Sequence, residues 1–211
     1  MGTVRLTVPI SFVEKIVRRN IMKQSWKPGN MLYPVPAVMV SCADDEGRSD
    51  IITIAWTGTV CTNPPMLYIS VRPERYSYDI IKKSGEFVVN LTTRGLTKAV
   101  DYCGTKSARD VNKWEKMNLT AETSDFIKAP IIKESPVNIS CKVEQIIKLG
   151  SHDMFLASVQ GVQVDEGLLD SKSRLNLEKA GVIAYSHGQY FELGKILGKF
   201  GYSIARKKKR K

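Results

Sequence analysis

Two stretches of the sequence carry side chains that could together hold a flat, phosphorylated ring. The first, residues 50–57, reads as a strand in which small or hydroxyl-bearing residues alternate with larger apolar ones. The two sets are Thr53, Ala55 and Thr57 against Ile52, Ile54 and Trp56. Because alternate residues of a strand point to opposite faces, the first set predicts a small, polar face. Such a face suits a heteroaromatic ring with carbonyls and ring nitrogens, although an ordinary strand whose threonines face solvent has the same pattern.

The second stretch runs from the end of a strand into a helix. Ser70-Val71-Arg72 is followed, after two residues, by Arg75-Tyr76-Ser77, and Ser77 is a natural helix N-cap. A helix start presents free N–H groups with a partial positive charge, and guanidinium groups match phosphate oxygens. These residues predict a site for a phosphomonoester. A plain helix start with two solvated arginines explains them equally well.

Other kinds of site find little support. The four cysteines, at 42, 61, 103 and 141, form no Cys-x-x-Cys pair, and the chain has two histidines, His152 and His187. No protein-ligated metal is therefore expected, and Cys61 and Cys103 are interpreted as small apolar residues. The glycine-rich phosphate loop, the dinucleotide fingerprint and the nucleophile elbow are all missing. Scattered thiols favour a reducing, cytoplasmic location.

The positive charge is concentrated at the C-terminal end. The formal net charge is +11, but the last six residues, 206–211, are all Lys or Arg. Without them 26 basic residues face 21 acidic ones. A solvated basic tail is the simple interpretation. The tail could also hold phosphate by charge, as in nucleic-acid binding, or attract an anionic redox partner.

The elements that position these residues are mostly short strands. A helix is expected over 10–24, and no stretch is apolar and long enough to span a membrane or to serve as a secretory signal. Strands are expected over 37–43, 50–57, 66–72, 86–91, 137–149, 154–164 and 182–193, with helices over 76–83 and within 94–116. This order indicates a mainly β fold with inserted short helices, a barrel or sandwich rather than a doubly wound sheet.

Several segments, taken in order, resemble the flavin reductase-like family, and within it the flavoredoxins most. They cover residues 30–195. The segments are Tyr33–Pro36, Val38–Ser41, Asp50–Trp56, Asn63–Arg72, Arg75–Asp79, Glu86–Asn90, Asp101–Gly104, Ser107–Lys113 and His152–Ser158. No single motif is diagnostic, but this many in one order make chance agreement an unsatisfactory explanation.

The resemblance implies an FMN-binding split β-barrel that forms a homodimer, with the flavin near the subunit interface. Residues 30–205 would form the barrel, with a helical extension over 1–29 and the basic tail over 206–211. By position, Thr53, Ala55, Trp56 and Thr57 would lie along the ring and ribityl chain, and Ser70, Val71, Arg72, Arg75, Tyr76 and Ser77 at the ribityl and phosphate end. Asn90, Ser107 and Lys113 would close over the cofactor.

The resemblance also implies a function, an FMN-dependent oxidoreductase. His152 would lie at the reacting edge of the flavin, where its protonation responds near neutral pH; a histidine satisfied within the core or an interface is the alternative. Reducing equivalents would come from NAD(P)H or from a redox protein, and no motif in the sequence distinguishes these two donors. Two other functions stay open: an FMN-binding or electron-carrier module without turnover, and nucleic-acid binding through the tail.

Overall fold

The computed structural model describes residues 22–205, and one compact unit begins at Leu32. The expected helix over 10–24 lies almost wholly outside the described residues; its last three positions, 22–24, have no regular secondary structure. The basic tail over 206–211 lies outside them too. The helical extension and the role of the tail therefore stay predictions. Among residues 22–205, no helix combines the length and apolar character that crossing a membrane requires.

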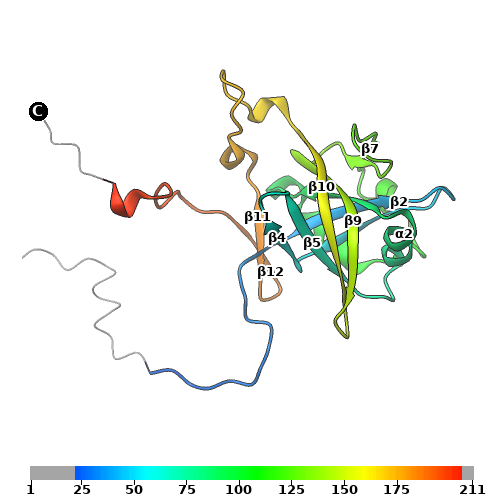
Figure 1. Ribbon diagram of the computed structural model, residues 1–211, viewed down its shortest axis with the longest axis horizontal. Coiled ribbons are helices and arrows are strands. Elements are labelled where there is room, and N and C mark those ends of the chain that lie inside the picture. Colours follow the sequence, from blue (N-terminus) through cyan, green and yellow to red (C-terminus); the bar gives the residue numbers. More distant parts are fainter. Residues whose placement is uncertain (1–21, 206–211) are drawn as a thin grey trace, which may run out of the picture. The chain divides into compact units, whose positions relative to one another are not determined.

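Short strands dominate the compact unit, and short helices lie between them (Figure 1). The strands are β1 (Val35–Pro36), β2 (Val38–Ala43), β3 (Ser49–Ile54), β4 (Thr57–Cys61), β5 (Met66–Val71), β6 (Glu86–Leu91), β7 (Ala121–Glu122), β8 (Ile131–Ile132), β9 (Val137–Lys148), β10 (Asp153–Val164), β11 (Ile183–Ser186) and β12 (Gln189–Glu192). The α-helices are α2 (Tyr76–Ser84), α3 (Thr97–Thr105) and α4 (Lys113–Lys116), and the 3-10 helices are η1 (Arg94–Leu96), η2 (Glu166–Leu168), η3 (Leu177–Ala180) and η4 (Tyr202–Ile204).

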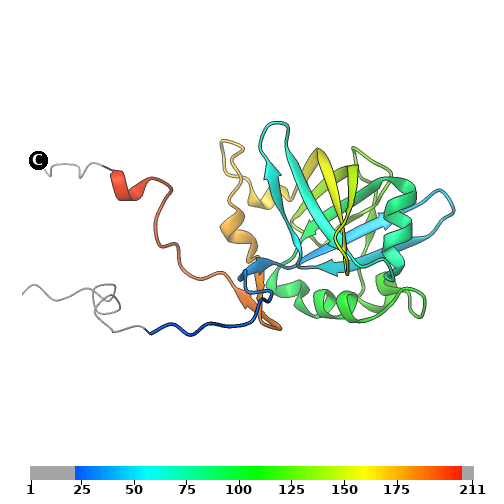
Figure 2. The same ribbon diagram turned by 60° about the horizontal axis from the view of Figure 1, so that its bottom comes forward.

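The main sheet has seven antiparallel strands in the order β3-β2-β6-β9-β10-β5-β4. Strands β3 and β4 are consecutive in the sequence, yet they form the two opposite edges of this sheet. Register shifts in the β9–β10 pair add to the bending of the sheet. The sheet curls so that its edges approach one another (Figure 2), and the N–H of Ser70 on β5 donates to the carbonyl of Trp56 at 2.9 Å. The expected split β-barrel with inserted helices is confirmed.

Two segments differ from the strands expected for them. The strand predicted over 50–57 ends at Ile54, and a bend at Ala55 and Trp56 carries the chain across to β4. The strand predicted over 182–193 is a hairpin, which turns at His187 and Gly188 with φ angles of 48° and 80°. Two successive positive φ angles match the twist of a tight hairpin, so the His-Gly pair is its sequence signal.

Apolar side chains fill the barrel and also join helix α3 to it. Phe87, Ile69 and Phe155 are fully buried inside the barrel. A second cluster includes Met39 of β2 and Val100 of α3, so α3 packs on the outer side of β2 and β3. This packing holds α3 beside the free edge of β3.

The four cysteines are free, and three of them are buried: Cys42, Cys103 and Cys141. Burial raises the pKa of all three thiols, to about 11 for Cys103 and about 12 for Cys141. Cys103 is therefore a protonated, apolar neighbour of the site described next, as expected of a small apolar residue.

Candidate functional site

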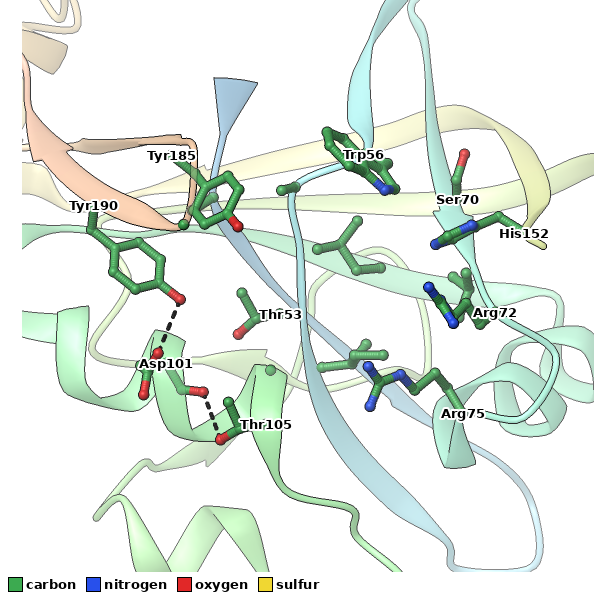
Figure 3. Close-up of a pocket in the computed structure, with 17 residues that line it drawn as sticks. Thr53, Trp56, Ser70, Arg72, Arg75, Asp101, Thr105, His152, Tyr185 and Tyr190 are labelled. Atoms are coloured by element: carbon green, nitrogen blue, oxygen red, sulfur yellow. Dashed lines mark hydrogen bonds between the residues drawn. The ribbon is translucent and has the colours of Figure 1, made fainter. Parts of the chain in front are cut away.

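A cavity of about 390 Å³ lies where the two edges of the curled sheet meet (Figure 3). Its walls come from β3 and the bend after it, the end of β5, helix α3 and the β11–β12 hairpin. The lining residues are Ala37, Ile52, Thr53, Ile54, Ala55, Trp56, Ser70, Val71, Arg72, Arg75, Asp101, Gly104, Thr105, His152, Tyr185, Gly188 and Tyr190. We call this the ring cavity.

The ring cavity owes its shape to the free edge of β3. An edge strand presents unpaired backbone N–H and C=O groups, and β3 pairs on one side alone, with β2. Helix α3 forms the opposite wall. Thr53 holds it in place, because Thr53 Oγ1 donates a hydrogen bond to the carbonyl of Val100 on α3 at 2.5 Å. The cavity is therefore bounded by the edge of β3 on one side and by α3 on the other.

Gly104 of α3 allows this close approach of helix and strand. A Cβ atom built on Gly104 would lie 3.2 Å from the Cβ of Thr53, tighter than an ordinary contact. We expect Gly104→Val to lower the free energy of unfolding by about 1–3 kcal/mol, because packing that is already tight must shift. Urea unfolding of the two proteins measures this. Equal stability would show that α3 can move away from β3 at no cost.

A second cavity, of about 300 Å³, shares Ile52 and Arg75 with the ring cavity. It lies at the start of α2 and is rich in cations. Its lining residues are Asp50, Ile52, Glu74, Arg75, Tyr76, Ser77, Cys103, Lys106, Ser107, Ala108, Arg109 and Lys113. We call this the basic cavity. The two shared residues make the cavities neighbours.

A buried ion pair underlies the basic cavity. Lys113 Nζ lies 2.9 Å from Asp50 Oδ1, with 3% and 1% of the two side chains exposed. The same ammonium group donates to the carbonyls of Ile51 at 2.6 Å and Cys103 at 3.4 Å. Ser77 Oγ donates to the other oxygen of Asp50 at 2.5 Å. Asp50 thus joins β3, the start of α2 and the start of α4.

Ser77 was expected to be the N-cap of α2, but it lies within the helix. The N-cap is Arg75, and no side chain caps the helix. The first N–H groups of a helix have no partner within it, so this end keeps free donors beside the basic cavity. Among residues 22–205, neither Arg75 nor Lys106 forms an ion pair, so the cavity keeps uncompensated positive charge. The arrangement suits a phosphate group.

Arg109 lines the basic cavity and is held by two contacts. Its Nη1 donates to the carbonyl of Glu74 at 3.0 Å, and its guanidinium lies 5.5 Å from the ring centre of Tyr76. These contacts tie the segment after α3 to the segment before α2.

His152 lies just before β10, at the tip of the β9–β10 hairpin, and reaches the ring cavity. Its Nδ1 is 2.9 Å from the hydroxyl of Ser151. Partial burial lowers the pKa of His152, and the nearby Arg72 and Arg75 lower it further, although Glu74 opposes them. The imidazole is therefore neutral at neutral pH.

Most of the predicted site residues line one of these two cavities. The ring cavity takes Thr53, Ala55, Trp56, Ser70, Val71, Arg72, Arg75 and His152, and the basic cavity takes Arg75, Tyr76, Ser77, Ser107 and Lys113. Thr57 and Asn90 line neither. Thr57 Oγ1 donates to the carbonyl of Tyr68 at 2.6 Å, while the fully buried Asn90 donates to the carbonyl of Met39 and accepts from the N–H of Ile132.

Several lining residues were not predicted. They include Asp50, Asp101, Gly104, Thr105, Lys106, Arg109, Tyr185, Gly188 and Tyr190. The segments Asp101–Gly104 and Ser107–Lys113 were the available signal for part of this set, because both belong to the resembling motifs. Among residues 22–205, no group of three or more His, Cys, Asp or Glu side chains could hold a metal ion.

Comparisons with known proteins agree with this geometry. A family model described as "Flavin reductase like domain" matches residues 31–194. An uncharacterized protein of Archaeoglobus fulgidus is 31% identical over 145 residues, 69% of this chain and 81% of that protein. The "FMN reductase (NADH) RutF" of Pseudomonas syringae is 23% identical over 62% of this chain and 71% of its own. The solved structure of flavoredoxin from Desulfovibrio vulgaris is 27% identical with a TM-score of 0.81, and the match covers 87% of this chain and 100% of the flavoredoxin.

Proposed function

Since the chain belongs to the flavin reductase-like family, we propose that it binds FMN across its two neighbouring cavities and passes reducing equivalents through it. The observation that carries this proposal is that the two cavities adjoin. The ring cavity at the edge of β3 shares Ile52 and Arg75 with a cation-rich cavity at the start of α2. A flat ring joined to a phosphate by a polar chain fits this succession.

The ring end supplies shape and hydrogen-bond partners. The backbone edge at Thr53 and Ala55 offers N–H and C=O groups, and Trp56 covers the ring cavity from the bend (Figure 3). The volume of about 390 Å³ lies within the range of ordinary cofactor sites. These residues would orient the isoalloxazine ring and exclude water from one of its faces.

The phosphate end supplies positive charge. Arg75, Lys106 and the free N–H groups of α2 would hold a terminal phosphate, while the Asp50–Lys113 pair is already neutral. Because of these cations, the site favours FMN over riboflavin, which has no phosphate to bind them.

When bound, FMN supplies the hydride and electron transfer, and the chain supplies binding and orientation. His152 lines the ring cavity as a neutral imidazole, which can form a hydrogen bond with an electron-donor molecule there. We place the approach of the electron donor at this side, beside Arg72. The two arginines would also favour an anionic donor.

Titration with FMN tests the proposal directly. We expect the purified protein to be yellow, or to quench the fluorescence of added FMN with saturation at one FMN per chain. We also expect riboflavin to bind at least about 10-fold more weakly, because one charged hydrogen-bonded contact contributes a factor of this order. A colourless protein that leaves FMN fluorescence unchanged would contradict the proposal.

The likeness to flavoredoxin favours a second candidate function, an electron carrier that takes electrons from a protein rather than from NAD(P)H. Anaerobic mixing with NADH or NADPH separates the two. Bleaching of the flavin absorbance by either nucleotide identifies a reductase. Bleaching by dithionite alone, followed by reoxidation with a redox protein, identifies the carrier. A homodimer and a cytoplasmic location stay predictions.

A further inference from the structure

The ring cavity is chemically asymmetric, and this asymmetry extends the proposed function. One end carries the cationic side chains Arg72 and Arg75, which can donate hydrogen bonds and cannot accept them. The opposite end, between α3 and the β11–β12 hairpin, carries the carboxylate of Asp101 (Figure 3). A ring bound here meets donors at one end and an acceptor at the other.

Most hydroxyl groups near Asp101 already donate a hydrogen bond to another group of the protein. Tyr190 O–H donates to Asp101 Oδ1 at 3.4 Å, Thr105 O–H donates to the main-chain carbonyl of Asp101 at 3.0 Å, and Thr53 O–H donates to Val100. What these groups still offer toward the cavity is lone pairs. This end therefore suits a ligand that brings its own N–H group.

Tyr190 and Tyr185 complete this end of the cavity. Burial raises the pKa of Tyr190 to about 12, with a further contribution from Asp101, so the phenol keeps its proton and holds Asp101 in place. The ring of Tyr185 lies 5.7 Å from that of Tyr190, and no hydrogen bond within residues 22–205 uses its hydroxyl. The free phenol of Tyr185 and the carboxylate of Asp101 line the same end of the cavity (Figure 3). Together they match an amide, because the phenol can donate to its carbonyl and the carboxylate can accept from its N–H.

We propose that Asp101 is a specificity-determining residue that accepts a hydrogen bond from the amide N–H of a flat ring in the ring cavity. The inference rests on the proposed function, because it takes that ring to be a redox cofactor or its donor. Two groups have the required chemistry: the imide of the flavin ring and the carboxamide of a nicotinamide. In both, a carbonyl lies beside the N–H and would face Tyr185.

Paired ligands that differ in this N–H test the inference. The first pair is FMN and its N3-methyl analogue, compared by dissociation constant. The second is NADH and its 3-acetylpyridine analogue, compared by KM for flavin reduction. For the ligand that contacts Asp101, we expect the native protein to prefer the N–H form by about 10- to 100-fold, as for hydrogen bonds to charged groups. In Asp101→Ala this preference should approach unity.

Matched variants complete the design. Glu166→Gln removes an exposed carboxylate that lines neither cavity and should keep the native preference. Tyr190→Phe keeps the Asp101 carboxylate but removes its phenol partner, so its preference should fall between those of the native protein and Asp101→Ala. Asp101 lies exposed on α3, and thermal unfolding checks that the variants fold.

The possible outcomes distinguish a failure of the Asp101 inference from a failure of the proposed function. Loss of the preference within the FMN pair assigns the flavin imide, and loss within the NADH pair assigns the carboxamide. If the native protein binds FMN and Asp101→Ala changes neither preference, the inference is wrong while the proposed function stands. If the native protein binds no FMN, the proposed function itself fails.

Discussion

Replacing Arg75 by Gln is expected to weaken FMN binding by about 10- to 100-fold and to leave riboflavin binding almost unchanged. Arg75 lines both cavities, lies at the uncapped start of α2 and forms no ion pair within the described part of the chain. Its charge is therefore available to a phosphate, and riboflavin has none. Fluorescence titration of both flavins against both proteins gives the two ratios.

Arg174→Gln is the matched control for this experiment. It removes an exposed arginine that pairs with Asp170 and lines neither cavity. If this change weakens FMN binding as much as Arg75→Gln does, the effect reflects the overall charge of the protein. If Arg75→Gln weakens both flavins equally, Arg75 supports the shape of the site rather than the phosphate.

Replacing Lys113 by Met should lower the free energy of unfolding by about 3–5 kcal/mol, the usual consequence of removing one partner from a buried ion pair. Asp50 would keep Ser77 and the N–H of Ile51 as donors, but its charge would be buried without a cation. Urea unfolding followed by tryptophan fluorescence measures the loss.

A double variant distinguishes a buried charge from lost packing. Asp50→Asn together with Lys113→Met removes both charges, so we expect it to recover part of the stability that Lys113→Met alone loses. Should the double variant be less stable than Lys113→Met by the full effect of Asp50→Asn, the two residues would be energetically independent. The linkage of β3, α2 and α4 through Asp50 would then be wrong.

The parts of the site that the sequence predicts are those built from contiguous residues. The contiguous stretch from Thr53 to Trp56 lines the cavity, and a strand end followed by a helix start brings Arg72 and Arg75 together. The expected alternation does not select the lining residues, because Ile52, Ile54 and Trp56 of the other set line the cavity as well. Each inference needs only residues that are close together in the sequence. The barrel followed similarly from the order of short strands and from the family resemblance.

Sequence reasoning missed two kinds of feature: positions where the chain leaves a regular strand, and contacts between residues that are far apart in the sequence. Thr57 was expected to continue the strand of Thr53, but the bend at Ala55 and Trp56 moves it to β4 on the opposite edge of the sheet. Asp101 and Tyr190 are 89 positions apart in the sequence and meet at one end of the cavity. Neither strand alternation nor helical spacing carries information about such a contact.

The buried thiols of the barrel bear on its resistance to oxidative damage. Cys103 borders the basic cavity with 1% of its surface exposed, and Cys42 and Cys141 are enclosed completely. Peroxide attacks the thiolate, and susceptibility also rises with exposure. The raised pKa values keep these three sulfur atoms protonated, so we expect peroxide to leave them unmodified in the folded protein.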